Sequence, residues 1–118
     1  MWPTVTFTES VKLRSKRLET VLREGGHTPS EFDAIVMDVQ GAEALVIQGA
    51  GEFLDPIRFI KAEAANFELY KGACTLETLT DVLREKGFAP IRKDCFQSTR
   101  GIGSCYDVVF KRVAPGNV

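Results

Sequence analysis

The sequence has no marked excess of charge of either sign and no long apolar segment. Its 118 residues carry a formal net charge of −1, and the densest basic run is the short stretch KLRSKR at Lys12–Arg17. Neither nucleic acid nor an anionic membrane surface is therefore an expected partner. No apolar run approaches the roughly 20 residues that span a bilayer, and the amino-terminal residues lack the pattern of a secretory signal.

Cysteine and histidine are also scarce. The three cysteines, Cys74, Cys95 and Cys105, are odd in number and form no CxxC pair, so neither a disulfide framework nor a zinc site is expected. Together with the missing signal pattern, this favours a reducing, cytoplasmic location. His27 is the single histidine, and it lies in a predicted loop, where a solvated side chain is its usual role. No metal site is predicted.

What the sequence does contain is an ordinary globular composition, with 44% hydrophobic and 26% charged residues, and a length that suits one domain over residues 1–118. Strand and helix patterns alternate along the chain. Helices are expected at Ser15–Gly26, Gly41–Leu54 and Thr75–Phe88, and strands at Thr4–Leu13, Ala34–Val39, Ile57–Ala64, Phe88–Lys93 and Tyr106–Val113. Ser15 and Thr75 are the expected N-caps, and Pro90 places its strand at a sheet edge or at a bulge.

This alternation predicts an α/β fold. Strands that are separated by helices form parallel sheets with right-handed crossovers, so we expect a mainly parallel sheet with helices on both faces. The nearly continuous apolar run AIVMDV is typical of a strand that is buried on both faces. The last two strands are separated only by the polar segment Asp94–Cys105, which is expected to be a loop, and they should form an antiparallel hairpin.

Two acidic residues lie at the ends of neighbouring predicted strands. Asp38 ends the run AIVMD, and Glu63 ends the run IRFIKAE. The carboxyl ends of adjacent parallel strands meet at the edge of the sheet where ligands bind, so the two carboxylates could share one mouth. There they could orient an acceptor hydroxyl or take its proton. The alternative is that Asp38 only caps the following helix.

The residues that follow these strands allow two interpretations each. Gly41 serves either the backbone geometry of the turn or the close approach of a ligand. Glu43 lies in the first turn of a predicted helix, where the macrodipole favours an acid, so a structural role and a site role are both open. Asn66 and Tyr70 lie in the loop after the second strand, where they could select a substrate or only pack the loop.

The segment FDAIVMDVQGAEALVIQGAGEFLDPIRFIKAE resembles the core of FkbM-type S-adenosylmethionine-dependent methyltransferases. In that family a strand ending in Ile-Asp-Val-Glu/Gln-Gly-Ala-Glu leads into a helix ending in Leu-x-Gly-Ala, and a second strand ends in Glu. The matching residues here are Asp38–Glu43, Gln48–Ala50 and Glu63. The similarity continues through YKGACTLETLTDVLREKGF and the closing YDVVFKR.

The resemblance implies transfer of a methyl group from S-adenosylmethionine to a small-molecule acceptor, typically a hydroxyl oxygen of a sugar or natural product. It implies that Asp38, Gln40 and Gly41 contact the cofactor and that Asp38 and Glu63 are catalytic. The residues implied to contact the acceptor are Glu43, Asn66 and Tyr70.

One feature of such enzymes is missing. Class I methyltransferases bind the cofactor with a glycine-rich turn after their first strand, and neither Gly49–Gly51 nor Gly101–Gly103 lies in that context. The chain therefore resembles the carboxyl-terminal part of a class I, Rossmann-like sheet with strand order 3-2-1-4-5-7-6. A truncated enzyme, a non-catalytic structural or interaction module, and one half of a split enzyme completed by another polypeptide all remain open.

The missing strands would expose one edge of the strand Ala34–Val39. Exposed apolar strand edges are pairing sites. We therefore expect this edge to be covered by the amino-terminal segment or by another copy of the chain, which makes a homo-oligomer a further expectation.

Overall fold

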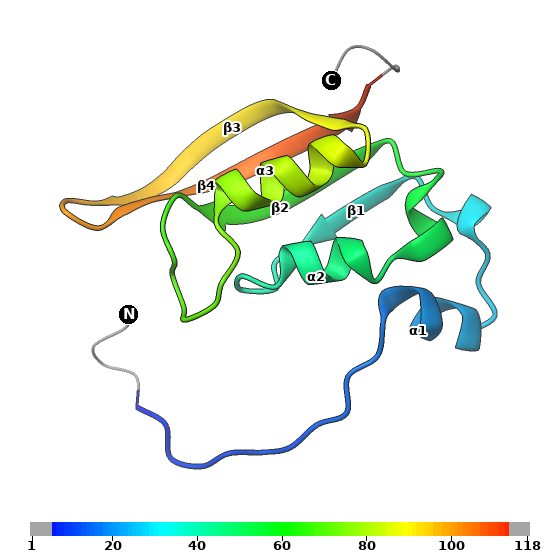
Figure 1. Ribbon diagram of the computed structural model, residues 1–118, viewed down its shortest axis with the longest axis horizontal. Helices are drawn as coiled ribbons and strands as arrows, with labels where there is room; N and C mark the ends of the chain where they lie inside the picture. The colour runs from blue at the N-terminus through cyan, green and yellow to red at the C-terminus, as the bar shows by residue number, and fades with distance from the viewer. Residues whose placement is uncertain (1–5, 114–118) are drawn as a thin grey trace.

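The computed structural model describes residues 6–113 as a small α/β arrangement (Figure 1). Its elements are α1 (Leu18–Glu24), the 3₁₀ turn η1 (Pro29–Glu31), β1 (Ala34–Met37), α2 (Glu43–Gln48), the 3₁₀ turn η2 (Gly51–Leu54), β2 (Phe59–Ala65), α3 (Leu76–Glu85), β3 (Phe88–Thr99) and β4 (Gly103–Arg112). The predicted α/β class is thus confirmed as a sheet accompanied by helices. No helix within residues 6–113 is long and apolar enough to cross a bilayer.

The four strands form one mixed sheet in the order β1-β2-β4-β3. β1 runs parallel to β2, with Met37 opposite Ala62, whereas β4 is antiparallel to both of its neighbours. The predicted carboxyl-terminal hairpin is confirmed, but the prediction of a mainly parallel sheet is wrong. The short turn after β3 makes β4 run antiparallel, and β4 then inserts beside β2, so only the β1–β2 pair is parallel.

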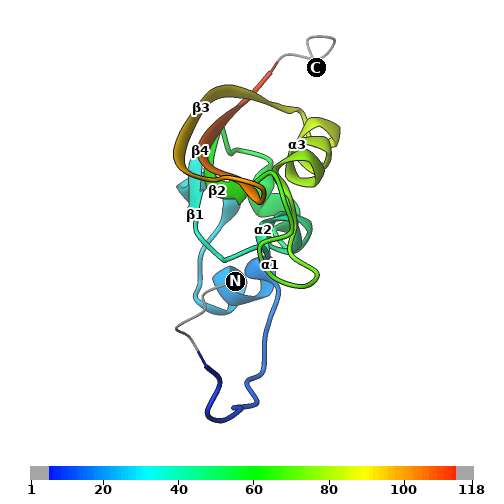
Figure 2. The same ribbon diagram turned by 90° about the vertical axis from the view of Figure 1, so that its left-hand side faces the viewer.

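Helices α2 and α3 lie on the same face of the sheet (Figure 2). On the opposite face Val36 is 76% exposed, and Phe59 and Lys61 are also exposed, so the prediction of helices on both faces is wrong for the described residues. The crossover through α2 leads from β1 to β2, and the crossover through α3 leads from β2 to β3, so both move in the same direction across the sheet. Because crossovers between parallel strands are right-handed as a rule, their helices lie on the same face of the sheet. β1 is therefore covered on one face rather than on two.

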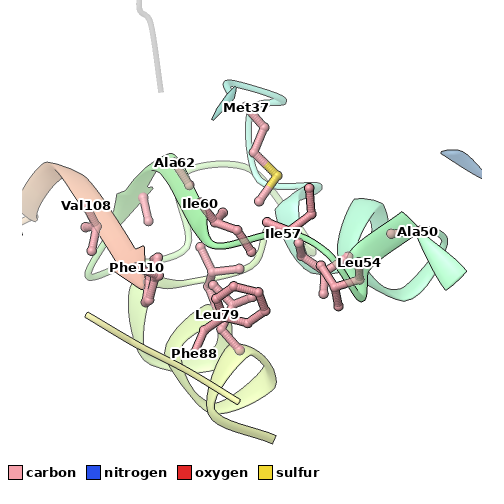
Figure 3. Packing of buried hydrophobic residues seen from close by; sticks show 13 residues of the cluster. Met37, Ala50, Leu54, Ile57, Ile60, Ala62, Leu79, Phe88, Val108 and Phe110 are labelled. Atoms are coloured by element: carbon pink, nitrogen blue, oxygen red, sulfur yellow. The ribbon is translucent and has the colours of Figure 1, made fainter. Parts of the chain in front are cut away.

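The covered face of the sheet holds the hydrophobic core (Figure 3). Alternate residues of β2 and β4 point into it, and Ile60, Val108 and Phe110 are fully buried there. Leu79 of α3 and Phe88 at the start of β3 pack in the same cluster. Burying one such side chain contributes roughly 1.5–3 kcal/mol, so this layer fixes the strands that carry the candidate site.

The β3–β4 hairpin is longer than the sequence pattern indicates. β3 continues to Thr99 and β4 begins at Gly103, so the predicted loop at Asp94–Cys105 is wrong apart from the turn at its centre. Pro90 lies on the edge strand, and the register shifts between Pro90 and Arg92, as predicted. Most of β3 is exposed, so it lacks the apolar alternation by which strands are recognised.

The two predicted helix caps have different outcomes. The Thr75 hydroxyl accepts a hydrogen bond from the Thr78 backbone N–H at 3.3 Å, which confirms that cap. The first helix begins at Leu18, with Arg17 in the capping position and no side-chain cap, so the prediction for Ser15 is wrong.

The amino-terminal segment also differs from its prediction. Residues 6–17 are exposed and have no regular secondary structure, so the strand expected at Thr4–Leu13 is wrong over residues 6–13, and its first two residues lie outside the described part. Residues 6–17 therefore do not cover the free edge of β1. Covering of that edge by another copy of the chain stays a prediction.

Candidate functional site

The turn that joins β1 to α2 is held by a buried glutamate. Glu43 is 2% exposed, and its carboxylate accepts hydrogen bonds from the backbone N–H groups of Val39 and Gly41, each at 3.1 Å. These hydrogen bonds give partners both to the backbone N–H groups of the turn and to the buried carboxylate, so Glu43 has a clear structural role. Its contact with an acceptor stays a prediction.

Gly41 has two physical reasons to be glycine. Its φ is +99°, and a Cβ atom on it would lie 2.5 Å from the Cβ of Ala73. Its carbonyl also accepts a hydrogen bond from the Cys74 N–H at 2.8 Å, which fastens the turn to the loop after β2. The geometry supports the structural interpretation of this glycine, and its contact with a cofactor stays a prediction.

Gln40 lies in the same turn with a φ of +52°, which is uncommon for a residue that has a side chain. Its amide nitrogen donates to Asp38 Oδ1 at 2.8 Å, and its amide oxygen accepts from the Tyr70 hydroxyl at 3.3 Å. Residues in such conformations cost about 1–3 kcal/mol and are concentrated at functional sites. Gln40 therefore connects the turn after β1 to the loop after β2.

Asp38 and Glu63 lie together, as expected for residues on adjacent parallel strands. Asp38 directly follows Met37, which pairs with Ala62 beside Glu63, and Glu63 in turn lies opposite Asp107 of β4. Burial, a hydrogen bond with Asp38 and the negative charges of Asp38 and Asp107 raise the pKa of Glu63 above its ordinary value. Glu63 therefore keeps its proton to a higher pH than a free glutamate does, which suits a group that holds or accepts a proton.

These residues line a cleft made of two adjoining cavities, a smaller one that we name the inner cavity and a larger one that we name the outer cavity. The inner cavity, of about 40 Å³, is bordered by Asp38, Gly41 and Glu43, and the outer cavity, of about 410 Å³, by the loop after β2 and the β3–β4 hairpin. Both are lined by Gln40, Glu63, Leu69, Phe96 and Cys105. The outer volume suits a small molecule. Among the described residues that line the cleft, none is a lysine or an arginine.

Asn66 and Tyr70 are not among the residues that line either cavity. The Asn66 side-chain oxygen accepts from the Ser104 N–H at 2.8 Å, and the Asn66 N–H donates to the Ser104 carbonyl at 3.0 Å. Tyr70 reaches the site through its hydrogen bond to Gln40. The structure thus gives both residues positioning roles, and their contact with an acceptor stays a prediction.

Sequence reasoning missed the part of the wall that comes from the hairpin. Phe96 and Ile102 line the outer cavity, and no motif marks them; Asp107 faces Glu63 and belongs to the segment YDVVFKR, but no site role was predicted for it. Asp107 had a signal, because it is an acid within the apolar pattern of a predicted strand. The other two lay in a segment expected to be a loop. Within residues 6–113, no group of three or more His, Cys, Asp and Glu side chains is arranged to hold a metal ion.

The part of this cleft that comes from β1, β2 and the segments after them lies within a region that matches a known family. The family model described as the methyltransferase FkbM domain matches residues 4–90, which include the turn after β1, both carboxylates and the loop after β2. The chain belongs to the FkbM methyltransferase family. The match to this FkbM domain ends at Pro90, so most of β3 and all of β4 lie beyond it.

A curated relative of this FkbM domain is the 2-O-methyltransferase NoeI of Sinorhizobium fredii (strain NBRC 101917 / NGR234), which is 39% identical over 79 residues. The aligned part is 67% of this chain and 32% of the relative, so the chain spans about a third of the length of that protein. No solved structure matches the chain. Methyltransferases of the FkbM type generally use S-adenosylmethionine.

Proposed function

We propose that this FkbM domain forms part of a site that moves the methyl group of S-adenosylmethionine to a hydroxyl oxygen of a sugar or another natural product. The observation that carries the proposal is the Asp38–Glu63 pair at the carboxyl ends of two parallel strands, beside a cavity large enough for a small molecule. Methyl transfer to a hydroxyl is helped by a base, and the raised pKa of Glu63 suits that task.

The described residues fit one side of the cofactor. S-adenosylmethionine supplies an activated methyl group on a positively charged sulfonium. The charged residues that line the inner cavity, Asp38, Glu43 and Glu63, are all acids, which suits that charge. In the proposed site Asp38, Gln40 and Gly41 hold the cofactor through a carboxylate, an amide and the backbone of the turn.

The chain's own residues act on the acceptor hydroxyl in this proposal. A carboxylate oxygen of Glu63 or of Asp38 accepts the hydroxyl proton and leaves a more nucleophilic oxygen. Gln40 orients Asp38 through the 2.8 Å hydrogen bond, and Glu43 holds the turn. Holding the acceptor close to the methyl group supplies much of the remaining rate enhancement.

The strand order supports a relationship to class I methyltransferases. The order β1-β2-β4-β3, with β4 antiparallel, has the arrangement of the last four strands in the order 3-2-1-4-5-7-6. In that arrangement the strand with the glycine-rich turn pairs with the free edge of β1. We therefore propose that the other side of the cofactor pocket comes from further segments of a longer chain or from another polypeptide.

A non-catalytic interaction module is the second candidate function. The edge of β1 that no strand of residues 6–113 pairs with and the 76% exposed Val36 favour it, because exposed apolar strands pair readily with other chains. This candidate needs no cofactor, so cofactor binding separates the two.

Calorimetric titration with S-adenosylhomocysteine tests the proposal. The chain is titrated alone and in the presence of a polypeptide that carries the glycine-rich strands, as wild type, as Asp38→Asn and as Glu85→Gln. Glu85 is exposed on α3 and lines neither cavity, so it is the matched control. We expect binding to the completed site that Asp38→Asn weakens and Glu85→Gln does not. No binding in either form would favour the interaction module.

A further inference from the structure

The outer cavity is bounded by a hairpin tip that is held in place. Asn66 bonds to both the N–H and the carbonyl of Ser104, and the hydroxyl oxygens of Ser98 and Ser104 lie 2.9 Å apart. A Cβ atom on Gly103 would lie 2.5 Å from both Asn66 Oδ1 and Phe67 Cδ1, so the tip and the loop after β2 are in close contact. The tip is therefore a positioned wall, as a selective site requires.

Large apolar side chains gather in this cavity. Phe96 and Ile102 line it from the hairpin and keep 50% and 61% of their surface exposed, and Phe67 and Leu69 line it from the loop after β2. Exposed apolar side chains that gather in a hollow are typical of ligand sites. Aromatic rings and branched aliphatic groups pack well against the C–H face of a ligand ring.

The polar groups of the cavity carry little charge. They are Gln40, Gln97, Thr99 and Glu63. Amides and hydroxyls both donate and accept hydrogen bonds, which suits the hydroxyl groups of a ligand. An anionic ligand would face Glu63 and the adjacent Asp107 with no lysine or arginine among the described lining residues, and this repulsion disfavours it.

We propose that the hairpin tip, defined by Phe96, Gln97, Thr99 and Ile102, is the acceptor-selecting wall of the cleft, and that it selects uncharged rings that combine hydroxyl groups with one apolar face. The inference rests on the proposed function, because it names the acceptor class of the same site. The bulge between Cys95 and Gln97 explains how Phe96 and Gln97, neighbours in one strand, both reach the cavity. The tip lies beyond the residues that match the family model.

A matched pair of sugar probes tests this selection without methyl transfer. 4-Nitrophenyl β-D-glucopyranoside and 4-nitrophenyl β-D-glucuronide differ only in carrying a hydroxymethyl group or a carboxylate, and amide NMR shifts of the isotope-labelled chain report their binding. We expect the neutral probe to bind at least about tenfold more tightly, with the largest shifts at Phe96–Gly103. Equal affinities, tighter binding of the glucuronide, shifts elsewhere or no binding of either probe would each overturn the proposal.

Two isoleucines of the same hairpin provide a variant and its control. Ile102→Ala shortens the wall, whereas Ile91→Ala shortens a 56% exposed residue of β3 that lines neither cavity of the cleft. We expect Ile102→Ala to weaken binding of the neutral probe about fivefold and Ile91→Ala to change it by less than about twofold. Equal effects would contradict the proposal. If the completed site fails to bind S-adenosylhomocysteine but the chain still prefers the neutral probe, only the proposal of methyl transfer is contradicted. If it binds S-adenosylhomocysteine but does not prefer the neutral probe, only the proposal of the acceptor-selecting wall is contradicted.

Discussion

The two ends of the sheet differ in how their charged side chains are surrounded: a hydrogen-bonded arginine lies at one end, and neighbouring acids that form no ion pair in the described part of the chain lie at the other. At the end where β2 begins, the Arg112 guanidinium donates to the carbonyls of Leu54, Ile57 and Lys86 at 2.6, 2.8 and 3.3 Å. It also lies 4.4 Å from the centre of the Phe88 ring. A single charged group thus joins η2, the segment before β2 and the end of α3 to β4, and each of its three nitrogens donates to a carbonyl oxygen.

At the end where β1 finishes, three acids lie in a row across neighbouring strands. Asp38 and Asp107 both lie beside Glu63, and none of the three forms an ion pair within residues 6–113. Unpaired like charges destabilise a fold and raise the pKa of a carboxyl group, and such groups are typical of functional sites. The difference assigns a stabilising role to the end with Arg112, whereas the acidic end is the one at which we propose methyl transfer.

Removing the arginine should give the largest effect. Arg112→Met keeps much of the side-chain length but loses the hydrogen bonds to three carbonyls, and we expect the free energy of unfolding to fall by about 3 kcal/mol. Urea denaturation measures this fall. Arg84→Met, at an exposed position of α3, is the matched control and should change stability by less than about 0.5 kcal/mol. Equal losses for the two variants would contradict a bracing role for Arg112.

The stability of the acidic end is expected to depend on close packing of the backbone turn instead of on ion pairs. Gly41→Ala places a Cβ atom against Ala73 at a position with positive φ, so we expect a loss of about 2 kcal/mol or more. Gly72→Ala has a similar φ of +79° and no neighbour within 4 Å, so it should cost only the strain of roughly 1 kcal/mol. Denaturation midpoints that coincide for the two variants would show that the contact with Ala73 is unimportant.

Features that depend on local chemistry were predictable from the sequence. The N-cap at Thr75 follows from its hydroxyl, the edge position of Pro90 from its missing N–H, and the parallel β1–β2 pair from the helical segment between the strands. The meeting of Asp38 and Glu63 then follows from that pair. These predictions needed no knowledge of residues far away in the chain.

Features that depend on distant partners were not predictable. The pattern YDVVFKR alone does not show that β4 lies between β2 and β3, because any internal position would bury its apolar residues equally well; only the family resemblance implies that order. Residues 6–13 alternate like a strand, yet an extended segment without a partner strand is not stable as a strand. Phe96 lines the cleft only because β3 continues to Thr99, where a loop was expected, so sequence reasoning missed the wall that the hairpin supplies.

The comparison also predicts the sign of a pH dependence at the acidic end. Because the pKa of Glu63 is raised, the folded state holds its proton more tightly than the unfolded state does. Stability from this group is therefore greatest below its ordinary pKa and falls as the pH rises through the raised value. Glu63→Gln should lose this dependence and be more stable than wild type near neutral pH. Urea midpoints measured between about pH 4 and pH 8 test this, and a slope that Glu63→Gln leaves unchanged would contradict it.

A pH dependence of stability with the opposite sign, and with the smallest effect of these predictions, is expected at the end of the sheet where Arg112 lies. Glu19 accepts a hydrogen bond from the Glu52 N–H at 3.0 Å and pairs with Arg23, and these contacts lower the pKa of Glu19 although partial burial opposes them. A lowered pKa gives stability that is present above the ordinary value and is lost as the pH falls through the lowered one. Glu19→Gln should thus be slightly less stable than wild type near neutral pH and equal to it in acid, since solvent screens this exposed group. If Glu19→Gln and Glu63→Gln changed the pH slope in the same direction, the two ends would not differ in how they use their acids.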